Sequence, residues 1–355
     1  MVYHVRDVLD SARPVPPPAH TSTDDIIARA HRIRGRRRAV AGSAAAVLAV
    51  AAIGAGVLVK PSGGNSMPTG EAIGEGFSTV FGEYRTGPER IGPVTQVTAG
   101  FQELPVYRDG DTWDDDQGRK YPLTDGAITF YAAGVFDPAT LGSQESGVTF
   151  GAAFPVTVGG KEGIGRKMTP AATGLQSAPP DQSVRTALAW QYADDAWAAY
   201  VPRATDRSSS TADAIRIAEA VVPGASHEVR APFRMTFVPA GWRTVSAEEN
   251  TTAYSNIVSE LYLFNGTLPA ADPVDIRLDG VNILVMRGQP KDGDIRGKDG
   301  VHCYTVPACT RVMGDYFIDV DGRASGLSAA TVRQIVDGLK PVDFTDHNAW
   351  LPIGG

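Results

Sequence analysis

The stretch Ala187-Leu-Ala-Trp-Gln-Tyr-Ala-Asp-Asp-Ala-Trp-Ala-Ala-Tyr-Val201 sets the fold that we expect for this chain. Two runs of apolar and aromatic residues flank a short polar break, Ala193-Asp-Asp195, which is typical of a tight turn between antiparallel strands. The hydroxyl residues of Ser208–Thr211 then suit the N-terminus of a helix over about residues 212–222. This segment therefore predicts a strand hairpin followed by a capped helix.

The same order of elements recurs near the C-terminus. Cys309-Thr-Arg-Val-Met-Gly-Asp-Tyr-Phe-Ile-Asp-Val320 predicts a second hairpin that turns at Met313-Gly-Asp, and a second helix is expected over about 328–339. Both helices end just before a proline, Pro223 or Pro341. Apolar residues recur at helical spacing in both, at Ile215, Ile217, Ala218, Val221, Val332, Ile335, Val336 and Leu339.

Further strand candidates precede each hairpin, and no helical pattern separates them. They are Val94–Thr98, Ile128–Ala132, Val148–Phe154, Val156–Val158, Phe233–Val238, Ile257–Phe264, Ile276–Leu278 and Val281–Arg287. Short connections without crossover helices favour antiparallel sheets. We therefore expect an α+β fold with two tandem antiparallel-sheet modules, 76–225 and 230–345, each closed by a C-terminal helix and preceded by one transmembrane helix.

The expected transmembrane helix covers residues 39–59, which contain no charged residue. At about 1.5 Å per residue this run spans roughly the 30 Å core of a bilayer. Arginines crowd its N-terminal flank, so residues 1–38 are expected in the cytoplasm, residues 60–75 as a linker, and the remainder outside. A cleaved leader and a buried Ala-rich helix of a soluble protein are the alternatives.

Charge is distributed unevenly along the chain. Residues 1–38 hold eight Arg and four Asp, a net charge of +4. The whole chain has a net charge of −7, so the remaining residues have a net charge of −11. An acidic bulk argues against nucleic acid as a partner. The tail either docks a cytosolic regulatory partner or is a charged stalk whose arginines meet lipid headgroups.

The second module opens with Phe233-Arg-Met-Thr-Phe-Val-Pro-Ala-Gly-Trp242, and the tail combines a Pro-rich break with an Arg-rich helix before an Ala-rich span. These patterns resemble actinobacterial single-pass membrane proteins associated with extracytoplasmic-function sigma factors, which are anti-sigma-like regulators. The resemblance implies a regulatory role across a membrane. The His-x-x-x-Cys-x-x-Cys zinc motif of many anti-sigma domains is absent, which puts capture of a sigma factor in doubt.

The two cysteines, Cys303 and Cys309, flank Pro307. In an exported domain this spacing predicts a disulfide, whereas a zinc site with His302 would need further ligands. No metal or other cofactor is expected.

Two other groups of residues are candidate sites. An acidic loop contains Asp109, Asp111, Asp114, Asp115 and Asp116, whose spacing lacks the order of a calcium loop, so a solvated loop is preferred over a Ca²⁺ site. Aromatic residues alternate along the first hairpin at Trp190, Tyr192, Trp197 and Tyr200. Core packing is their default role, and a binding groove for sugar or peptide is the alternative.

No catalytic motif occurs: the chain lacks Gly-x-Ser-x-Gly, His-Glu-x-x-His and a phosphate-binding loop. We therefore expect a single-pass membrane protein, not an enzyme, whose exported module binds or senses a protein or envelope ligand. The alternative is an extracytoplasmic hydrolase of cell-envelope material, which would require a cleft with two close carboxylates.

Overall fold

The computed structural model describes residues 77–115, 118–142, 148–170, 183–203, 207–250, 255–266 and 279–353, all within one compact unit, Gly64–Gly355. The strands of its first half are β1 (Ser78–Thr79), β2 (Tyr84–Thr86), β3 (Glu89–Ile91), β4 (Gln96–Thr98), β5 (Phe101–Asp114), β6 (Lys120–Tyr131), β7 (Val148–Val158), β8 (Lys161–Pro170), β9 (Arg185–Ala193) and β10 (Ala196–Pro202). Those of the second half are β11 (His227–Glu228), β12 (Arg230–Ala231), β13 (Phe233–Met235), β14 (Arg243–Glu249), β15 (Ile257–Phe264), β16 (Val281–Arg287), β17 (Gly300–Cys303), β18 (Ala308–Met313), β19 (Tyr316–Asp321), β20 (Leu339–Pro341) and β21 (Leu351–Pro352). The helices are α3 (Thr211–Glu219), α4 (Ala329–Gly338) and the short 3₁₀ turns η1 (Pro138–Thr140) and η2 (His347–Ala349).

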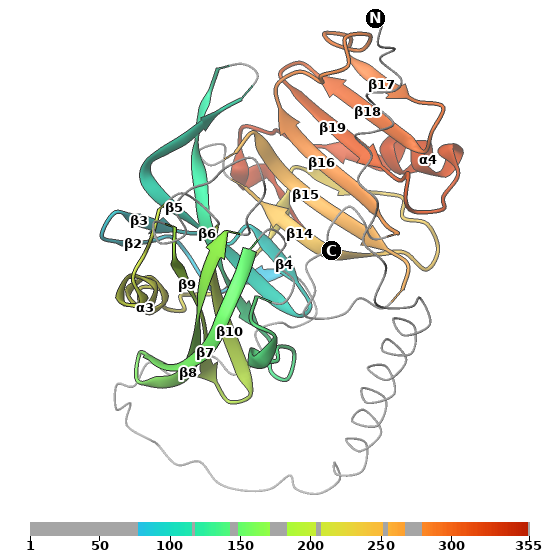
Figure 1. The fold of residues 1–355 in the computed structure, drawn as a ribbon. Helices are drawn as coiled ribbons and strands as arrows, with labels where there is room; N and C mark the ends of the chain where they lie inside the picture. Colours follow the sequence, from blue (N-terminus) through green and yellow to red (C-terminus); the bar gives the residue numbers. More distant parts are fainter. Residues whose placement is uncertain are drawn as a thin grey trace, which may run out of the picture. The chain divides into compact units, whose positions relative to one another are not determined.

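One 15-stranded sheet dominates the fold (Figure 1). Its strand order is β17-β18-β19-β16-β15-β14-β4-β5-β6-β10-β9-β8-β7, with β3 and β2 added beside β5. The two halves of the chain meet where β4 pairs with β14, through Thr98 opposite Ser246 and Val97 opposite Ala247. This pairing gives hydrogen-bond partners to two strands that would otherwise expose free edges.

Both predicted hairpin–helix units are confirmed locally. Strands β9 and β10 turn at Asp194-Asp195, and β18 and β19 turn at Gly314-Asp315. Each following helix begins at a serine whose side chain accepts a hydrogen bond from the backbone three residues on, Ser210 for α3 and Ser328 for α4. Helix α3 lies against β9 and β7, and α4 lies against β17, β18 and β19 (Figure 1).

The expected α+β class of two separate modules is nevertheless wrong. Strands are far more abundant than helices in the described residues, where α3 and α4 contain only nine and ten residues. The β4–β14 pairing also fuses the expected sheets into one. Sequence patterns identified several strands, including β15, β16 and the two predicted hairpins, but missed β5, β8 and β14, and the candidate Ile276–Leu278 lies outside the described residues. The long-range pairing that joins the two hairpin systems leaves no local signal.

The transmembrane helix that completed the expected fold class is not supported either. Within the described ranges, no helix is both long enough and apolar enough to cross a bilayer. The segment that carried the prediction, residues 39–59, lies outside those ranges, as do the tail 1–38 and the linker 60–75. The boundaries 76–225 and 230–345 remain predictions.

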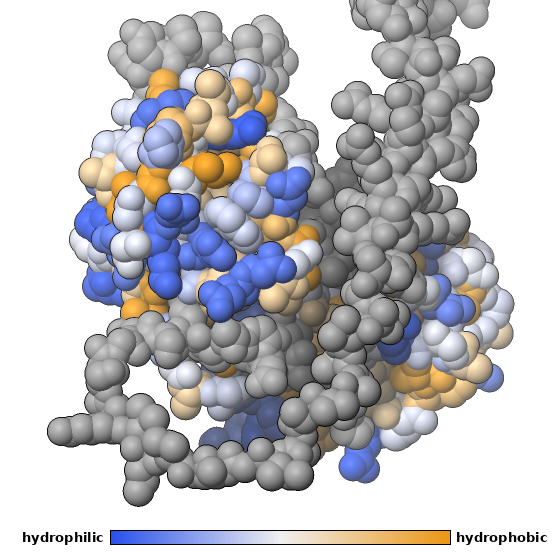
Figure 2. Space-filling model, turned by 90° about the horizontal axis from the view of Figure 1, so that it is seen from below, coloured by the Kyte–Doolittle hydropathy of each residue, from blue (hydrophilic) through white to orange (hydrophobic). Residues whose placement is uncertain are grey.

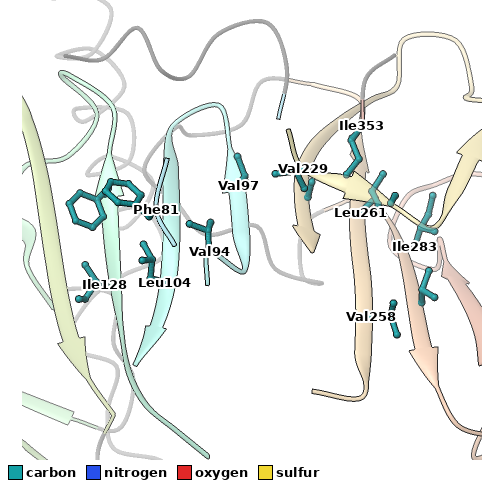
Figure 3. Packing of buried hydrophobic residues seen from close by; sticks show 14 of the residues in the cluster. Phe81, Val94, Val97, Leu104, Ile128, Val229, Val258, Leu261, Ile283 and Ile353 are labelled. Atoms are coloured by element: carbon teal, nitrogen blue, oxygen red, sulfur yellow. The ribbon is translucent and has the colours of Figure 1, made fainter. Parts of the chain in front are cut away.

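A single main hydrophobic core serves both halves of the sheet. It includes Leu104 and Ile128 from the first half and Leu261 and Ile283 from the second, with Val97 of β4 between them (Figure 3). The chain that leads into the second half is held by C-terminal strands: β20 pairs with β13, and β21 pairs with β12. These contacts tie the end of the chain to the junction of the two halves.

Strand β7 forms one end of the sheet and, among the described strands, pairs only with β8. A two-residue turn, Gly159-Gly160, joins them, with Val158 opposite Lys161. In such a hairpin the flanking pair exchanges both hydrogen bonds, so alternate residues, including Pro155, direct their backbone outward. Pro155 therefore places its missing N–H on the free edge, where it blocks pairing with another chain.

Candidate functional site

Alternation of side chains gives the strands of the second half, together with β4, two different faces. On one face, directly opposed residues form an apolar row across the strands: Val97, Ala247, Leu261, Ile283, Val320 and Cys309. All six are buried in the main core. The other face carries mostly polar residues, because successive side chains in a strand point to opposite sides.

This polar face consists of two rows. The first contains Thr98, Ser246, Tyr262, Asn282, Asp321 and Ala308 in direct cross-strand register. The second contains Glu248, Glu260, Leu284, Asp319 and Thr310. We use "polar face" for these eleven residues.

Acidic residues in the second row are partly removed from water. Glu248 lies directly opposite Glu260, so their Cβ atoms are cross-strand neighbours at about 5 Å. Burial raises the pKa of the Glu248 carboxyl to about 8, with further contributions from the charges of Glu260 and Glu103. Burial also raises the pKa of Glu260 and that of Asp319. Carboxylic acids whose pKa is raised by burial and by neighbouring charge mark a candidate functional site.

A pocket of about 140 Å³ opens in the first row. Its lining consists of Tyr262, Gly280, Asn282, Asp321, Arg323 and Ala324. The Asn282 Nδ2 donates a hydrogen bond to the Glu260 Oε1 over 2.6 Å, while the Asn282 Oδ1 is buried without a hydrogen-bond partner. The pocket lining is thus joined to the acidic pair through one hydrogen bond from Asn282.

Charges within the pocket lining are balanced. The Arg323 Nε donates to the Asp321 Oδ1 over 2.9 Å, and this guanidinium lowers the pKa of the Asp321 carboxyl. The wall beside Tyr262 needs a glycine, because a Cβ on Gly280 would lie 2.3 Å from the Tyr262 Cε1 atom. This close approach lets the tyrosine ring lie against the backbone and keeps the pocket open.

The four aromatic residues predicted from the sequence do not line one surface. Trp190 and Tyr200 are buried in the main core, at 4% and 0% exposure, and Tyr192 packs against it. Tyr192 donates its hydroxyl proton to the Tyr131 carbonyl over 2.7 Å, and burial raises its pKa. Trp197 lies on the opposite face, against a second, smaller core cluster.

The core position of Tyr200 is next to a buried ion pair. Arg185 donates from both terminal nitrogens to the Asp125 carboxylate, over 2.8 and 2.6 Å. Both side chains are buried, and the Arg185 Nη1 also donates to the Arg203 carbonyl. This buried bidentate ion pair links β9 to β6 and has the geometry expected of a structural interaction.

The disulfide predicted between Cys303 and Cys309 is present. The two residues lie directly opposite each other at the end of the β17–β18 hairpin. The enclosed loop exposes Tyr304 and Val306. Among the described residues, no group of three or more His, Cys, Asp or Glu side chains is placed to hold a metal.

The predicted acidic loop is in part a strand. Asp109, Asp111 and Asp114 lie in β5, and Asp116 lies outside the described residues. Asp109 pairs with Arg85, Asp111 with Arg207, and Asp115 with Arg119. These arginines, distant in the sequence except for Arg119, serve as the counter-charges.

Sequence reasoning missed the polar face entirely. Alternation in Tyr316-Phe-Ile-Asp-Val-Asp321 places Asp319 and Asp321 on the side opposite Ile318 and Val320, a signal that was present in the sequence. It could not show that Glu248 and Glu260 are opposite each other, because register between strands is set by tertiary pairing. Asn282 and Asp321, 39 positions apart in the sequence, are neighbours for the same reason.

Comparisons with known proteins do not assign a family. No family model matches the chain, and no curated protein does. Two solved structures are similar over 77% of this chain and 96% of theirs: the crystal structure of MucB in complex with MucA(peri), and the complex of Pseudomonas aeruginosa MucA/MucB. Each is 10% identical, with TM-scores of 0.21 and 0.20, values too low to establish a shared fold.

Proposed function

We propose that the described part of this chain is a non-catalytic binding module, and that it acts outside the cytoplasm in a sensing or regulatory role. The observation that carries the proposal is the pocket lined by Asn282, Asp321 and Arg323, which a hydrogen bond from Asn282 joins to the partly buried acids of the neighbouring row. A concave site with polar lining and neighbouring carboxylic acids of perturbed pKa is a candidate ligand site.

Hydrolysis is the weaker alternative on this geometry. A glycosidase needs two carboxylates on either side of the bond that it cleaves. The described lining of the pocket contains one carboxylate, Asp321, which is engaged by Arg323. Glu260 reaches the pocket only through Asn282. The arrangement is therefore better suited to holding a ligand than to cleaving it.

The location outside the cytoplasm rests on the disulfide, because reducing compartments keep most cysteines as thiols. Labelling of intact cells with a membrane-impermeant maleimide after mild reduction tests it. Exported chain would be labelled at Cys303 and Cys309 without lysis. Labelling that requires lysis would refute this location.

Photocrosslinking tests whether the pocket binds anything in the cell. A diazirine amino acid at Ala324, which is exposed and lines the pocket, is expected to give a discrete adduct on the full chain. The same residue at Ala330, exposed on α4, is the matched control. Equal adducts at both positions would refute a binding pocket, whereas release of soluble fragments from purified bacterial cell-wall sacculi would favour the hydrolase.

A further inference from the structure

The two cysteines of the C-terminal hairpin lie in different environments. Cys303, at the end of β17, is exposed, whereas Cys309 of β18 has only 1% of its surface exposed. Cys309 belongs to the main hydrophobic core, where the buried Val320 is its direct neighbour on β19. A reagent in solution therefore reaches the two residues unequally, and Cys303 is the accessible one.

A cation lies next to the exposed cysteine. The Arg333 Nη1 of α4 donates a hydrogen bond to the Cys303 Sγ over 3.8 Å, and the Arg333 side chain is itself half exposed. The Arg333 Nε donates to the Asp337 carboxylate over 2.9 Å, and Asp337 also lies 3.9 Å from Arg311, so two guanidinium groups share one negative charge. A positive charge beside a sulfur atom favours the thiolate over the thiol once that cysteine is reduced.

Cys309 has no such support. Within the described part of the chain, no charged side chain donates a hydrogen bond to the Cys309 Sγ. An apolar environment disfavours the charged form of a thiol. A reduced chain would therefore have one nucleophilic thiol, at Cys303, and one inert thiol, at Cys309.

The hairpin holds the two thiols within reach of each other. Cys303 and Cys309 are directly opposed in the β17–β18 register, with their Cα atoms 4.1 Å apart. Backbone hydrogen bonds support the loop between them: the Tyr304 N–H donates to the Ala308 carbonyl over 3.0 Å, and the Gly322 N–H donates to the Pro307 carbonyl over 2.9 Å. A thiol positioned in this way reacts with its neighbour intramolecularly, which is faster than reaction with a thiol from solution.

We propose that Cys303 is a site of thiol–disulfide exchange with an organic disulfide, and that Cys309 is the resolving thiol. The Cys303 thiolate attacks one sulfur of the disulfide R–S–S–R, which forms a mixed disulfide on Cys303 and releases one R–S⁻. The Cys309 thiol gives its proton to water and attacks the Cys303 sulfur, which closes the Cys303–Cys309 bond and releases the second R–S⁻. The chain loses two electrons and the organic disulfide gains them. This assignment does not rest on the pocket of the polar face.

Single-cysteine variants of the full chain, incubated with oxidised glutathione, test the order of the two steps. Cys309→Ser keeps Cys303 and should form a glutathione adduct under native conditions, as followed by intact mass. Cys303→Ser keeps only the buried thiol and should react about tenfold more slowly or less. In concentrated urea both thiols are exposed, and the two variants should react at similar rates. Equal native rates, or faster reaction at Cys309, would overturn the proposal, and so would a difference that persists in urea.

A charge variant tests the contribution of the neighbouring cation. In the Cys309→Ser chain, Arg333→Gln should slow adduct formation by about threefold or more, because a smaller fraction of Cys303 is then thiolate. Arg296→Gln removes the same charge from an exposed side chain that is hydrogen-bonded to neither sulfur, and is the control. Equal rates for Arg333→Gln and Arg296→Gln would overturn the role of Arg333.

The wild-type chain keeps the test decisive if a single-cysteine variant folds poorly. Reduced wild type is mixed with oxidised glutathione, quenched with acid at short times and mapped by peptide mass spectrometry. The transient adduct is expected on Cys303. An adduct mainly on Cys309 would overturn the assignment of the entry thiol.

Discussion

The acidic pair of the polar face makes a quantitative prediction about stability. Glu248→Gln keeps the size of the side chain and its ability to hydrogen-bond, but removes its ionised form. Glu248 faces Glu260 directly, and its pKa is raised from 4.5 to about 8, first by burial and then by the charges of Glu260 and Glu103. The folded state therefore binds this proton more tightly than the unfolded state does.

The sign and pH range of the effect follow from linkage. Below about pH 4.5 both states are protonated and Glu248 costs nothing. As the pH rises towards 8 the unfolded state ionises first, so the folded protein loses stability through this interval. The loss is complete only above the folded pKa, where a charge must be kept in the partly buried row.

The size of the loss can be bounded. A change from 4.5 to about 8 corresponds to roughly 5 kcal/mol, at about 1.4 kcal/mol for each tenfold change in proton affinity. Some solvent reaches the Glu248 side chain, and proton sharing with Glu260 spreads the penalty over two groups. We therefore expect Glu248→Gln to stabilise the protein by about 2 kcal/mol at pH 9.

Urea unfolding of the full chain, followed by tryptophan fluorescence at pH 5, 7 and 9, measures this difference. Wild type and Glu248→Gln should have similar free energies of unfolding at pH 5 and diverge as pH rises. Glu162→Gln, on the exposed side of β8, should follow wild type at every pH. A gap between Glu248→Gln and wild type that does not change with pH would refute the reasoning, and so would a less stable variant at pH 9.

Three other perturbations test the framework around the site. Asp125→Ala leaves the Arg185 guanidinium buried without its ion-pair partner, and should lower the free energy of unfolding by about 3–5 kcal/mol in the same urea assay. A loss below about 1 kcal/mol would mean that the Asp125–Arg185 ion pair does not stabilise the fold. Pro155→Val restores an N–H on the free edge of β7, a strand without charged residues, and should cause concentration-dependent self-association in sedimentation velocity. Pro155→Lys also restores the N–H but adds a charge, and should sediment as wild type does at every concentration. Replacing Cys303 and Cys309 by serine should cost about 2 kcal/mol for a seven-residue ring, and reduced wild type should match the variant if the disulfide itself is responsible.

Local structure was predictable where the pattern was strong and the contacts were close in sequence. Helix α4 was expected over about 328–339 and is observed at Ala329–Gly338, because its cap and its apolar spacing both lie within the segment. The hairpin turn at Asp194-Asp195 was likewise readable from polar residues between two apolar runs. The disulfide followed from cysteine count and spacing.

For the aromatic residues of the first hairpin, the sequence shows the alternation along each strand but not the pairing between strands. Core packing was the expected role of Trp190, Tyr192, Trp197 and Tyr200, with a binding groove as the alternative, and Trp190 and Tyr200 are buried in the main core. Trp197 and Tyr200 are three residues apart in β10, so alternation alone places them on opposite faces, whereas only the pairing of β9 with β10 sets Tyr200 opposite Leu188. The register between β14 and β15 could likewise not be predicted from the sequence, so the pairing of Glu248 with Glu260 was not foreseen.

By itself, the sequence determined the antiparallel hairpins, the two capped helices and the disulfide, since each depends on residues a few positions apart. Only the tertiary structure decided that β4 joins β14 and that Glu248, Glu260 and Asp319 lie in one row beside a pocket at Asn282. The physical reason is that side-chain alternation fixes the two faces of every strand, whereas the register between strands distant in sequence is chosen by how their apolar faces pack together. The candidate site lies on the opposite face of that packing, so its residues were brought together by a core in which they take no part.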